Sequence, residues 1–258
     1  MKKLIYLISV TLLLLQSCSS GDSSSGADNS TPSNNVLLKS VTSSKGSISN
    51  YIYNGSKLDK IADDSGVNYT QVTYTGDLIT KTENYNNNKL SDETIYLYND
   101  TKLVQVISYG HHSTDLKLDA SAFYTYNSNG TVSVSSYLMD SNGKEERSHI
   151  LFYDSARKMN RIEVDNNADG KSDGYTNLEY DSKNNPLYNI IGVDKMLWIP
   201  DYVDSIFYLA HLAKNNLTKT ESADNMLINT YDYNSKGYPT SILTRYNSGN
   251  EGIAYFYY

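Results

Sequence analysis

Alternating apolar and polar residues fill most of the chain from residue 36 to its end. Because side chains at i and i+2 share one face of a strand, such alternation predicts strands with one buried face. Polar turns rich in Asn, Asp and Gly separate the runs at intervals of roughly 8–12 residues, which is typical of all-β folds. The runs that open on aliphatic residues predict strands at Leu58–Ala62, Leu78–Glu83, Leu103–Tyr109, Val132–Leu138, Met159–Val164 and Ser241–Tyr246.

A tyrosine phrase repeats along these runs. It is fullest as Tyr-Asp-Tyr-Asn-Ser-Lys-Gly at 231–237 and returns as Tyr-Thr-Tyr-Asn-Ser-Asn-Gly at 124–130. Its intervals of 21–28 residues, with one doubled interval before Tyr233, indicate a repeated supersecondary unit. In each unit one strand ends at a tyrosine. An Asn or Asp then forms the turn, and the next strand follows. The marked tyrosines are Tyr53, Tyr74, Tyr98, Tyr126, Tyr153, Tyr180, Tyr233 and Tyr257.

Paired tyrosines of one phrase, such as Tyr51 and Tyr53 or Tyr255 and Tyr257, are expected to share one packed face. The predicted fold is therefore all-β: an antiparallel up-and-down meander of about 15 strands curled into a barrel or half-barrel. Curling is expected because an open sheet of this size leaves long unpaired edges.

The doubled interval holds a different pattern. Pro200 and Asp201 suit the first turn of a helix, and Asn215-Asn216 suits its end, so one inserted helix is predicted at about 200–213. It is apolar around most of its circumference, so it must be buried. We expect it to plug or cap the curled sheet, because a wide barrel is not filled by its own side chains. A partner-binding or lid helix around Trp198 is the alternative.

The N-terminus has the features of a bacterial lipoprotein signal. Two lysines precede a short apolar run and Gln16-Ser17-Cys18, and the run is too short to span a bilayer. Residues 1–17 are predicted to be a signal peptide and Cys18 the lipid-modified residue that anchors the protein to a membrane. Residues 18–35 are predicted to form a flexible Ser/Asn/Gly tether, followed by a repetitive β-meander domain at 36–258.

The phrase Tyr-x-Tyr-[Asn/Asp]-x-x-Gly resembles the YD repeat of bacterial Rhs wall proteins. The wider pattern resembles a bacterial lipoprotein family with a domain of unknown function and a porin-like fold. That resemblance covers roughly residues 36–258 and includes the segments at 180–187, 214–219 and 231–239. It implies a large antiparallel sheet curled into a barrel or half-barrel, and it brings no catalytic residues with it.

Charge, cysteine content and motifs limit the partners and activities that the sequence supports. The formal net charge is -7 and no basic stripe is present, which argues against nucleic acid as a partner. A single cysteine excludes an internal disulfide. No nucleophile elbow or phosphate-binding loop appears, so we expect no enzyme.

One loop has calcium-loop spacing. Asp165, Asn167, Asp169 and Asp173 offer side-chain oxygens, and Lys171 offers its backbone carbonyl. Thr176 stands where the full motif has a bidentate acid, so weak calcium binding is predicted. A polar hairpin turn is the alternative reading. Calcium is the one candidate cofactor.

Together these features predict a monomeric, lipid-anchored protein of the bacterial cell envelope, at the outer membrane. The expected role is non-enzymatic binding or scaffolding, with a glycan, peptide or lipid as ligand. Two alternatives stay open, a transmembrane β-barrel pore and a secreted glycan or peptide hydrolase. Mid-strand charges such as Lys60, Lys81 and Arg161 argue against the pore.

Overall fold

The computed structural model describes residues 36–112, 115–140, 143–156, 158–200 and 213–258, which belong to one compact unit. Sixteen antiparallel strands form a closed barrel in which each strand pairs with its neighbours along the chain. The strands are β1 (Ser40–Ser43), β2 (Ile48–Asn54), β3 (Lys57–Asp63), β4 (Tyr69–Thr75), β5 (Leu78–Asn86), β6 (Lys89–Asn99), β7 (Lys102–His112), β8 (Asp115–Tyr126), β9 (Val132–Asp140), β10 (Gly143–Tyr153), β11 (Met159–Asp165), β12 (Gly174–Tyr180), β13 (Leu217–Glu221), β14 (Met226–Tyr233), β15 (Pro239–Tyr246) and β16 (Glu251–Tyr257).

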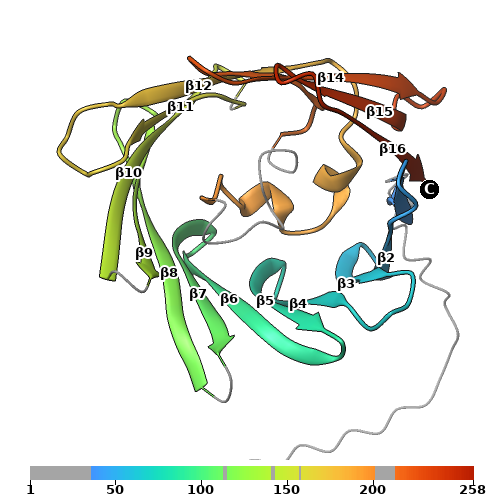
Figure 1. Cartoon of the computed structure of the whole chain (residues 1–258), viewed down its shortest axis with the longest axis horizontal. Helices are drawn as coiled ribbons and strands as arrows, with labels where there is room; N and C mark the ends of the chain where they lie inside the picture. The colour runs from blue at the N-terminus through green and yellow to red at the C-terminus, as the bar shows by residue number, and fades with distance from the viewer. Residues whose placement is uncertain (1–35, 113–114, 141–142, 157, 201–212) are drawn as a thin grey trace, which may run out of the picture. The chain divides into compact units, whose positions relative to one another are not determined.

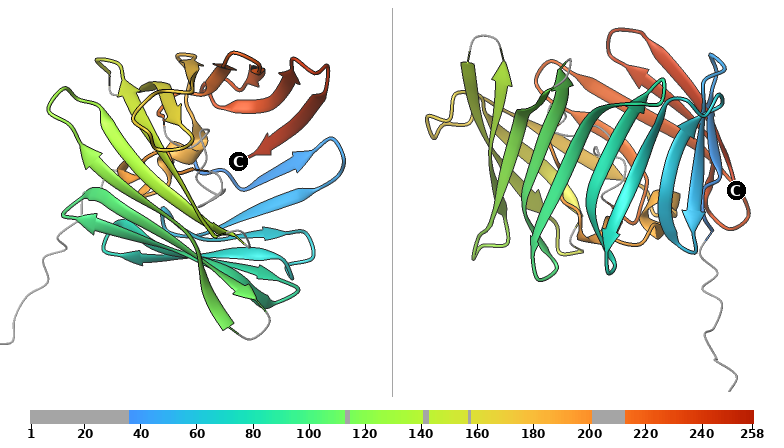
Figure 2. Two further views of the ribbon diagram at one scale, coloured as in Figure 1. Left: turned by 60° about the vertical axis from the view of Figure 1, so that its left-hand side comes forward. Right: turned by 90° about the horizontal axis from the view of Figure 1, so that it is seen from below.

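Closure joins the two ends of the sheet. β1 pairs with β16, with Val41 opposite Phe256, and no edge strand is left among the described residues (Figure 1). The prediction of an antiparallel meander is confirmed, with sixteen strands in place of about 15 and a closed barrel in place of the open choice between barrel and half-barrel. The strands are inclined to the barrel axis, as closure of a twisted sheet requires (Figure 2).

A short segment of the chain lies inside the ring of strands (Figure 1). This lumen segment, residues 186–199, contains two short 3-10 turns, η1 (Pro186–Asn189) and η2 (Val193–Lys195). Its buried residues join the core made by the inner faces of the strands. They are Leu187, Ile190, Val193, Met196, Trp198 and Ile199.

Specific contacts fix the lumen segment to the wall. The Ile191 amide donates to the Ser56 carbonyl at 3.1 Å, next to the β2–β3 turn. The Tyr124 hydroxyl of β8 donates to the Trp198 carbonyl at 3.2 Å, and the His149 ring of β10 packs edge-on against the Trp198 indole at 4.8 Å. Side chains on the same face as Tyr124 and His149 therefore point into the barrel.

The opposite face of the strands is charged. Arg161 and Glu163 flank buried Ile162 on β11 and form an ion pair at 2.8 Å. On β5, Lys81 pairs with Glu83 at 2.8 Å, and these two flank buried Thr82. The inner face of the barrel thus combines apolar side chains with buried polar ones such as Thr82 and His149, and over several strands the outer face is charged.

The predicted inserted helix at about 200–213 falls almost wholly on residues 201–212, which lie outside the described residues. In the described part of the chain the non-strand elements are the two 3-10 turns, so the helix is not confirmed. Trp198 lies in irregular chain after η2 and is buried inside the barrel. No helix among the described residues is both long and apolar enough to cross a bilayer.

Gly192 is where the lumen segment comes closest to the wall. Its φ is +89°, and a Cβ there would lie 2.7 Å from the Asp77 carbonyl oxygen and 3.1 Å from Ile79 Cγ1. Contacts under 3.0 Å force a shift, and the nearest atom here is backbone. Only glycine therefore allows this approach without strain.

We predict that Gly192→Ala lowers the free energy of unfolding by about 2–4 kcal/mol, through both overpacking and the positive φ. Gly46→Ala is the matched control, because Gly46 has φ +86° and open space around its Cβ position. The control carries the backbone penalty alone, about 1 kcal/mol. Urea denaturation of both variants measures the difference. Equal losses would contradict close packing of the lumen segment at Gly192.

Candidate functional site

Seven tyrosines form a ring around one end of the barrel. Each ends, or nearly ends, an even-numbered strand and stands opposite an apolar residue that opens the next strand in the sheet. We call this ring the tyrosine rim. Its members are Tyr53, Tyr74, Tyr98, Tyr126, Tyr153, Tyr180 and Tyr233. Their partners, all buried, are Leu58, Ile79, Leu103, Val132, Met159, Leu217 and Pro239.

A change of register accompanies most rim tyrosines. Tyr53 pairs with Leu58 but its neighbour Ile52 pairs with Lys60, so Asp59 is an extra residue in β3. Bulges of this kind bend a strand and increase its twist. The repeated phrase therefore curves the sheet at this end while it places one tyrosine ring after another over the core.

The last copy of the phrase departs from this arrangement. Tyr255 and Tyr257 are 43% and 51% exposed, and Tyr255 pairs with Ser241 on the outer face. Tyr258 takes the inner position in their place and donates its hydroxyl to the Pro239 carbonyl at 2.7 Å. The prediction that Tyr255 and Tyr257 are packed is wrong, because the alternation in β16 points Ala254 and Phe256 inward.

Some rim hydroxyls have a hydrogen-bond partner and others do not. Tyr126 donates to the Leu103 carbonyl at 3.1 Å, Tyr74 accepts the Leu58 amide at 3.1 Å, and Tyr233 donates to the Asp181 carboxylate. The buried hydroxyls of Tyr53 and Tyr98 have no hydrogen-bond partner in the described part of the chain. The same holds for Tyr180 and for the indole nitrogen of Trp198.

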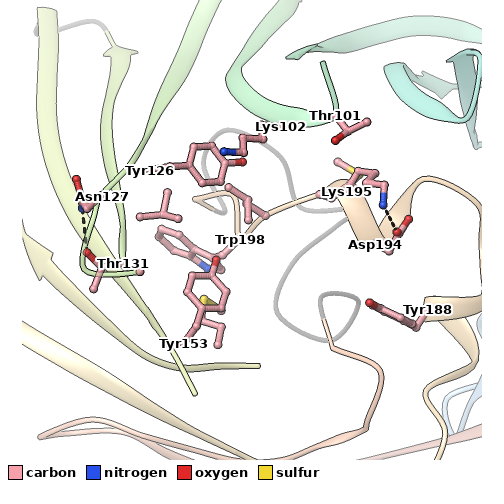
Figure 3. A pocket seen from close by; sticks show the side chains of 15 residues that line it. Thr101, Lys102, Tyr126, Asn127, Thr131, Tyr153, Tyr188, Asp194, Lys195 and Trp198 are labelled. Atoms are coloured by element: carbon pink, nitrogen blue, oxygen red, sulfur yellow. Dashed lines mark hydrogen bonds and ion pairs between the residues drawn. The ribbon is translucent and has the colours of Figure 1, made fainter. Parts of the chain in front are cut away.

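A cavity of about 680 Å³ opens between the rim and the lumen segment (Figure 3). Its barrel side comes from the β6–β7 and β8–β9 turns and from strand ends, those of β10 and β11 included. Its inner side comes from the lumen segment. The lining residues are Thr101, Lys102, Tyr126, Asn127, Gly130, Thr131, Val132, Tyr153, Met159, Tyr188, Asp194, Lys195, Met196, Leu197 and Trp198.

Aromatic side chains occupy the middle of the cavity wall. In Figure 3 Trp198 lies next to Tyr153, with Tyr126 close by. Trp198 is 7% exposed and held by the contacts with Tyr124 and His149 described above. Contacts with two strands therefore hold Trp198 in its place in the cavity wall.

Polar groups surround that wall on three sides. Asn127 and Thr131 of the β8–β9 turn are hydrogen-bonded at 2.9 Å, Lys102 comes from the start of β7, and Asp194 and Lys195 form an ion pair at 2.6 Å in η2 (Figure 3). Lys102 lies 5.1 Å from the centre of the Tyr126 ring and has no carboxylate partner among the described residues. The described lining of the cavity thus carries one net positive charge.

The predicted hydrolase alternative calls for two carboxylates at one cleft. The described lining of the cavity has one, Asp194, and it is paired with Lys195.

The predicted calcium ligands all lie in the β11–β12 loop, at the opposite end of the barrel from the tyrosine rim. Asp165 accepts the Asp169 and Gly170 amides at 3.1 and 2.7 Å, and Asp173 accepts the Asn166 amide at 2.8 Å. Asn167 and Asp169 likewise accept amides of the loop. No group of three or more acidic, His or Cys side chains suited to a metal occurs in the described part of the chain. Calcium binding stays a prediction.

The predicted signal peptide, Cys18 and the tether fall in residues 1–35, outside the described residues. The cavity was missed by sequence reasoning, because its walls come from two turns, several strand ends and a distant segment. The signal available was Trp198, the single tryptophan, in the one stretch where the repeat breaks.

Burial makes the rim region sensitive to alkaline pH. It raises the pKa of Tyr51 and of Tyr74 to about 12, and raises the pKa of Tyr53 and Tyr153 further. The unfolded chain loses these protons near pH 10, whereas the folded chain keeps them. The free energy of unfolding is therefore constant below about pH 10 and falls between about pH 10 and 12.

We predict that Tyr51→Phe flattens this fall, by at most about 1.4 kcal/mol per pH unit, the limit for one proton. Urea denaturation between pH 8 and 11.5 provides the measurement. Tyr255→Phe, at an exposed position, serves as the control and keeps the parent slope. An unchanged slope in Tyr51→Phe would contradict the burial of this side chain.

Comparison with known proteins connects the barrel to solved structures. A porin-like protein from Bacteroides vulgatus superposes with a TM-score of 0.56 at 14% identity, covering 86% of this chain and 99% of that one. A porin-like protein from Bacteroides uniformis gives a TM-score of 0.53 at 14% identity, covering 85% and 96%. No family model and no curated protein matches the chain. The chain therefore has the porin-like sixteen-stranded barrel fold.

Proposed function

We propose that the protein is a non-enzymatic binding protein of the bacterial cell envelope, which holds a small ligand in the cavity between the tyrosine rim and the lumen segment. The observation that carries this proposal is the cavity itself: about 680 Å³, with aromatic rings in its wall and polar groups on several sides. Ligand sites are typically concave, mostly preformed and lined by aromatic and apolar side chains with a few placed polar groups.

The barrel supports this role as a scaffold. The wall residues stand at strand ends, and the Trp198 side is fixed by contacts to β8 and β10. Preorganised walls reduce the entropy lost when a ligand binds.

Location in the envelope is supported by the lipoprotein-like N-terminus and by the porin-like fold. The anchor would be lipid chains on Cys18, with residues 18–35 as the tether. The proposed role requires no nucleic-acid partner. A monomer is sufficient for it.

A lipid-spanning pore is the second candidate. The closed sixteen-stranded barrel and its porin-like relatives favour it, as do Leu97, Phe123 and Ile150, which are exposed on the outer face of β6, β8 and β10.

Charge on the outer face weighs against the pore. The Lys81–Glu83 and Arg161–Glu163 pairs lie in mid-strand on β5 and β11, and Lys219 of β13 lies 3.6 Å from Glu179 of β12. A lysine or arginine on the lipid face near the bilayer midplane costs about 2–4 kcal/mol. Apolar side chains of the lumen segment also pack against the inner face of the strands, which argues against a wide open channel.

A comparison of two environments tests the proposal against the pore. We expect a chain that starts at Ser19 to stay monodisperse in buffer without detergent, and to produce no conductance when added to planar bilayers. Size-exclusion chromatography with light scattering and bilayer recording supply the two readouts. Aggregation without detergent together with stepwise conductance would reverse the assignment.

Calcium is a separate proposal, supported by the spacing of the β11–β12 loop. Binding at Kd of about 1 mM would add about 1.4 kcal/mol of stability in 10 mM CaCl₂. That gain corresponds to a rise in Tm of about 3–6 °C for a barrel of this size. Thermal unfolding with CaCl₂ or with EDTA tests it, and Asp173→Asn should reduce the rise. Identical melting curves would leave the loop as a polar turn.

A further inference from the structure

The polar groups of the cavity lie on several sides of its aromatic wall. Thr101 and Lys102, Asn127 and Thr131, and Asp194 and Lys195 come from three different parts of the chain, around an aromatic wall (Figure 3). A ligand with one polar head and one apolar tail would contact one of these sides and cover the others with hydrocarbon. The Asn127–Thr131 hydrogen bond and the Asp194–Lys195 ion pair would remain, but these groups would lose their contacts with water, which is unfavourable. The arrangement therefore favours a ligand with hydrogen-bonding groups all around its edge.

Sugar rings have this chemistry. Hydroxyl groups surround the ring edge, and the ring faces carry C–H groups that pack on the flat side chains of Tyr and Trp. The cavity offers Trp198 and Tyr153 beside each other, with Tyr126 nearby and Tyr188 on the other side (Figure 3). Tyr188 lines the cavity, and its hydroxyl is able both to donate and to accept a hydrogen bond with a ligand hydroxyl.

Charge narrows the class of sugar. Lys195 is neutralised by Asp194 at 2.6 Å, whereas the exposed Lys102 has only the face of Tyr126 as its partner within the described structure. An ammonium on an aromatic face still has hydrogens for a carboxylate, and such charge-assisted hydrogen bonds are stronger than neutral ones. The net charge of the lining is therefore complementary to one carboxylate.

From these observations we infer that the cavity binds an acidic oligosaccharide, with a uronic-acid carboxylate at Lys102 and a sugar ring against Trp198 and Tyr153. This inference rests on the proposed binding function and names its ligand class. The volume of about 680 Å³ is in the range for a ligand of a few sugar rings.

Trp198 makes the test specific to this site. It is the single tryptophan of the chain, so a change in tryptophan fluorescence reports on the cavity wall. The full chain is titrated with trigalacturonate, maltotriose, dodecanoate and tri-alanine, and calorimetry confirms each affinity. We expect trigalacturonate to bind about two- to fivefold tighter than maltotriose, the range for one exposed ion pair.

Two variants separate the contributions. Lys102→Met should remove the preference for trigalacturonate over maltotriose, because the ammonium is the group that pairs with the carboxylate. Tyr188→Phe should weaken both sugars by about two- to tenfold, through the loss of one hydrogen bond. Lys45→Met is the control, since Lys45 lies in the β1–β2 turn at the opposite end of the barrel and should change neither affinity.

Each result decides between the two proposals. Equal affinity for the two sugars would overturn the acidic specificity. Binding of dodecanoate or tri-alanine without either sugar would overturn the carbohydrate assignment and leave the binding function in place. Absence of binding by all four probes at millimolar concentration would overturn both.

Discussion

The width of the barrel is the constraint on which the rest of the structure depends. About eight strands make an interior that side chains alone can fill, and wider barrels leave an open lumen. With sixteen strands, this barrel needs additional chain inside it. The lumen segment at 186–199 supplies Leu187, Ile190, Met196 and Trp198 to the same core as the strands. The ion pairs of β5 and β11 lie on the other face of the sheet, away from this core.

Much of this architecture could be read from the sequence. The period-2 alternation located the strands, and each aliphatic run from Leu58–Ala62 to Ser241–Tyr246 lies in an observed strand. The need to avoid sheet edges favoured curling, but closure depends on the pairing of Val41 with Phe256, which no local pattern reveals. The orientation of Tyr255 and Tyr257 was wrong for a related reason: a one-residue change of phase reverses every side chain in a strand.

The cavity was harder to foresee. Tyr126 and Tyr153 belong to the repeat, and their pattern predicts packing residues; Tyr153 does pack against the core, whereas Tyr126 is 38% exposed. Their second role depends on Trp198, distant in sequence, lying beside them. The position of Trp198 is set by hydrogen bonds and ring packing with Tyr124 and His149, contacts that depend on the closed barrel. The break in the repeat indicated the region around Trp198. The site itself forms only when folding brings this region beside Tyr126 and Tyr153.

The seam between β1 and β16 has a consequence for how the chain reaches its folded state. Every other pairing joins strands that are neighbours along the chain, but the seam joins Ser40–Ser43 to the C-terminal residues. Contacts of such large sequence separation form late and slow a folding reaction. Hairpins between neighbouring strands are able to form one after another, whereas closure of the barrel requires β16, the last strand. Until the last strand pairs with the first, the chain is therefore an open sheet with two unpaired edges, and this is the stage at which it is most exposed to aggregation.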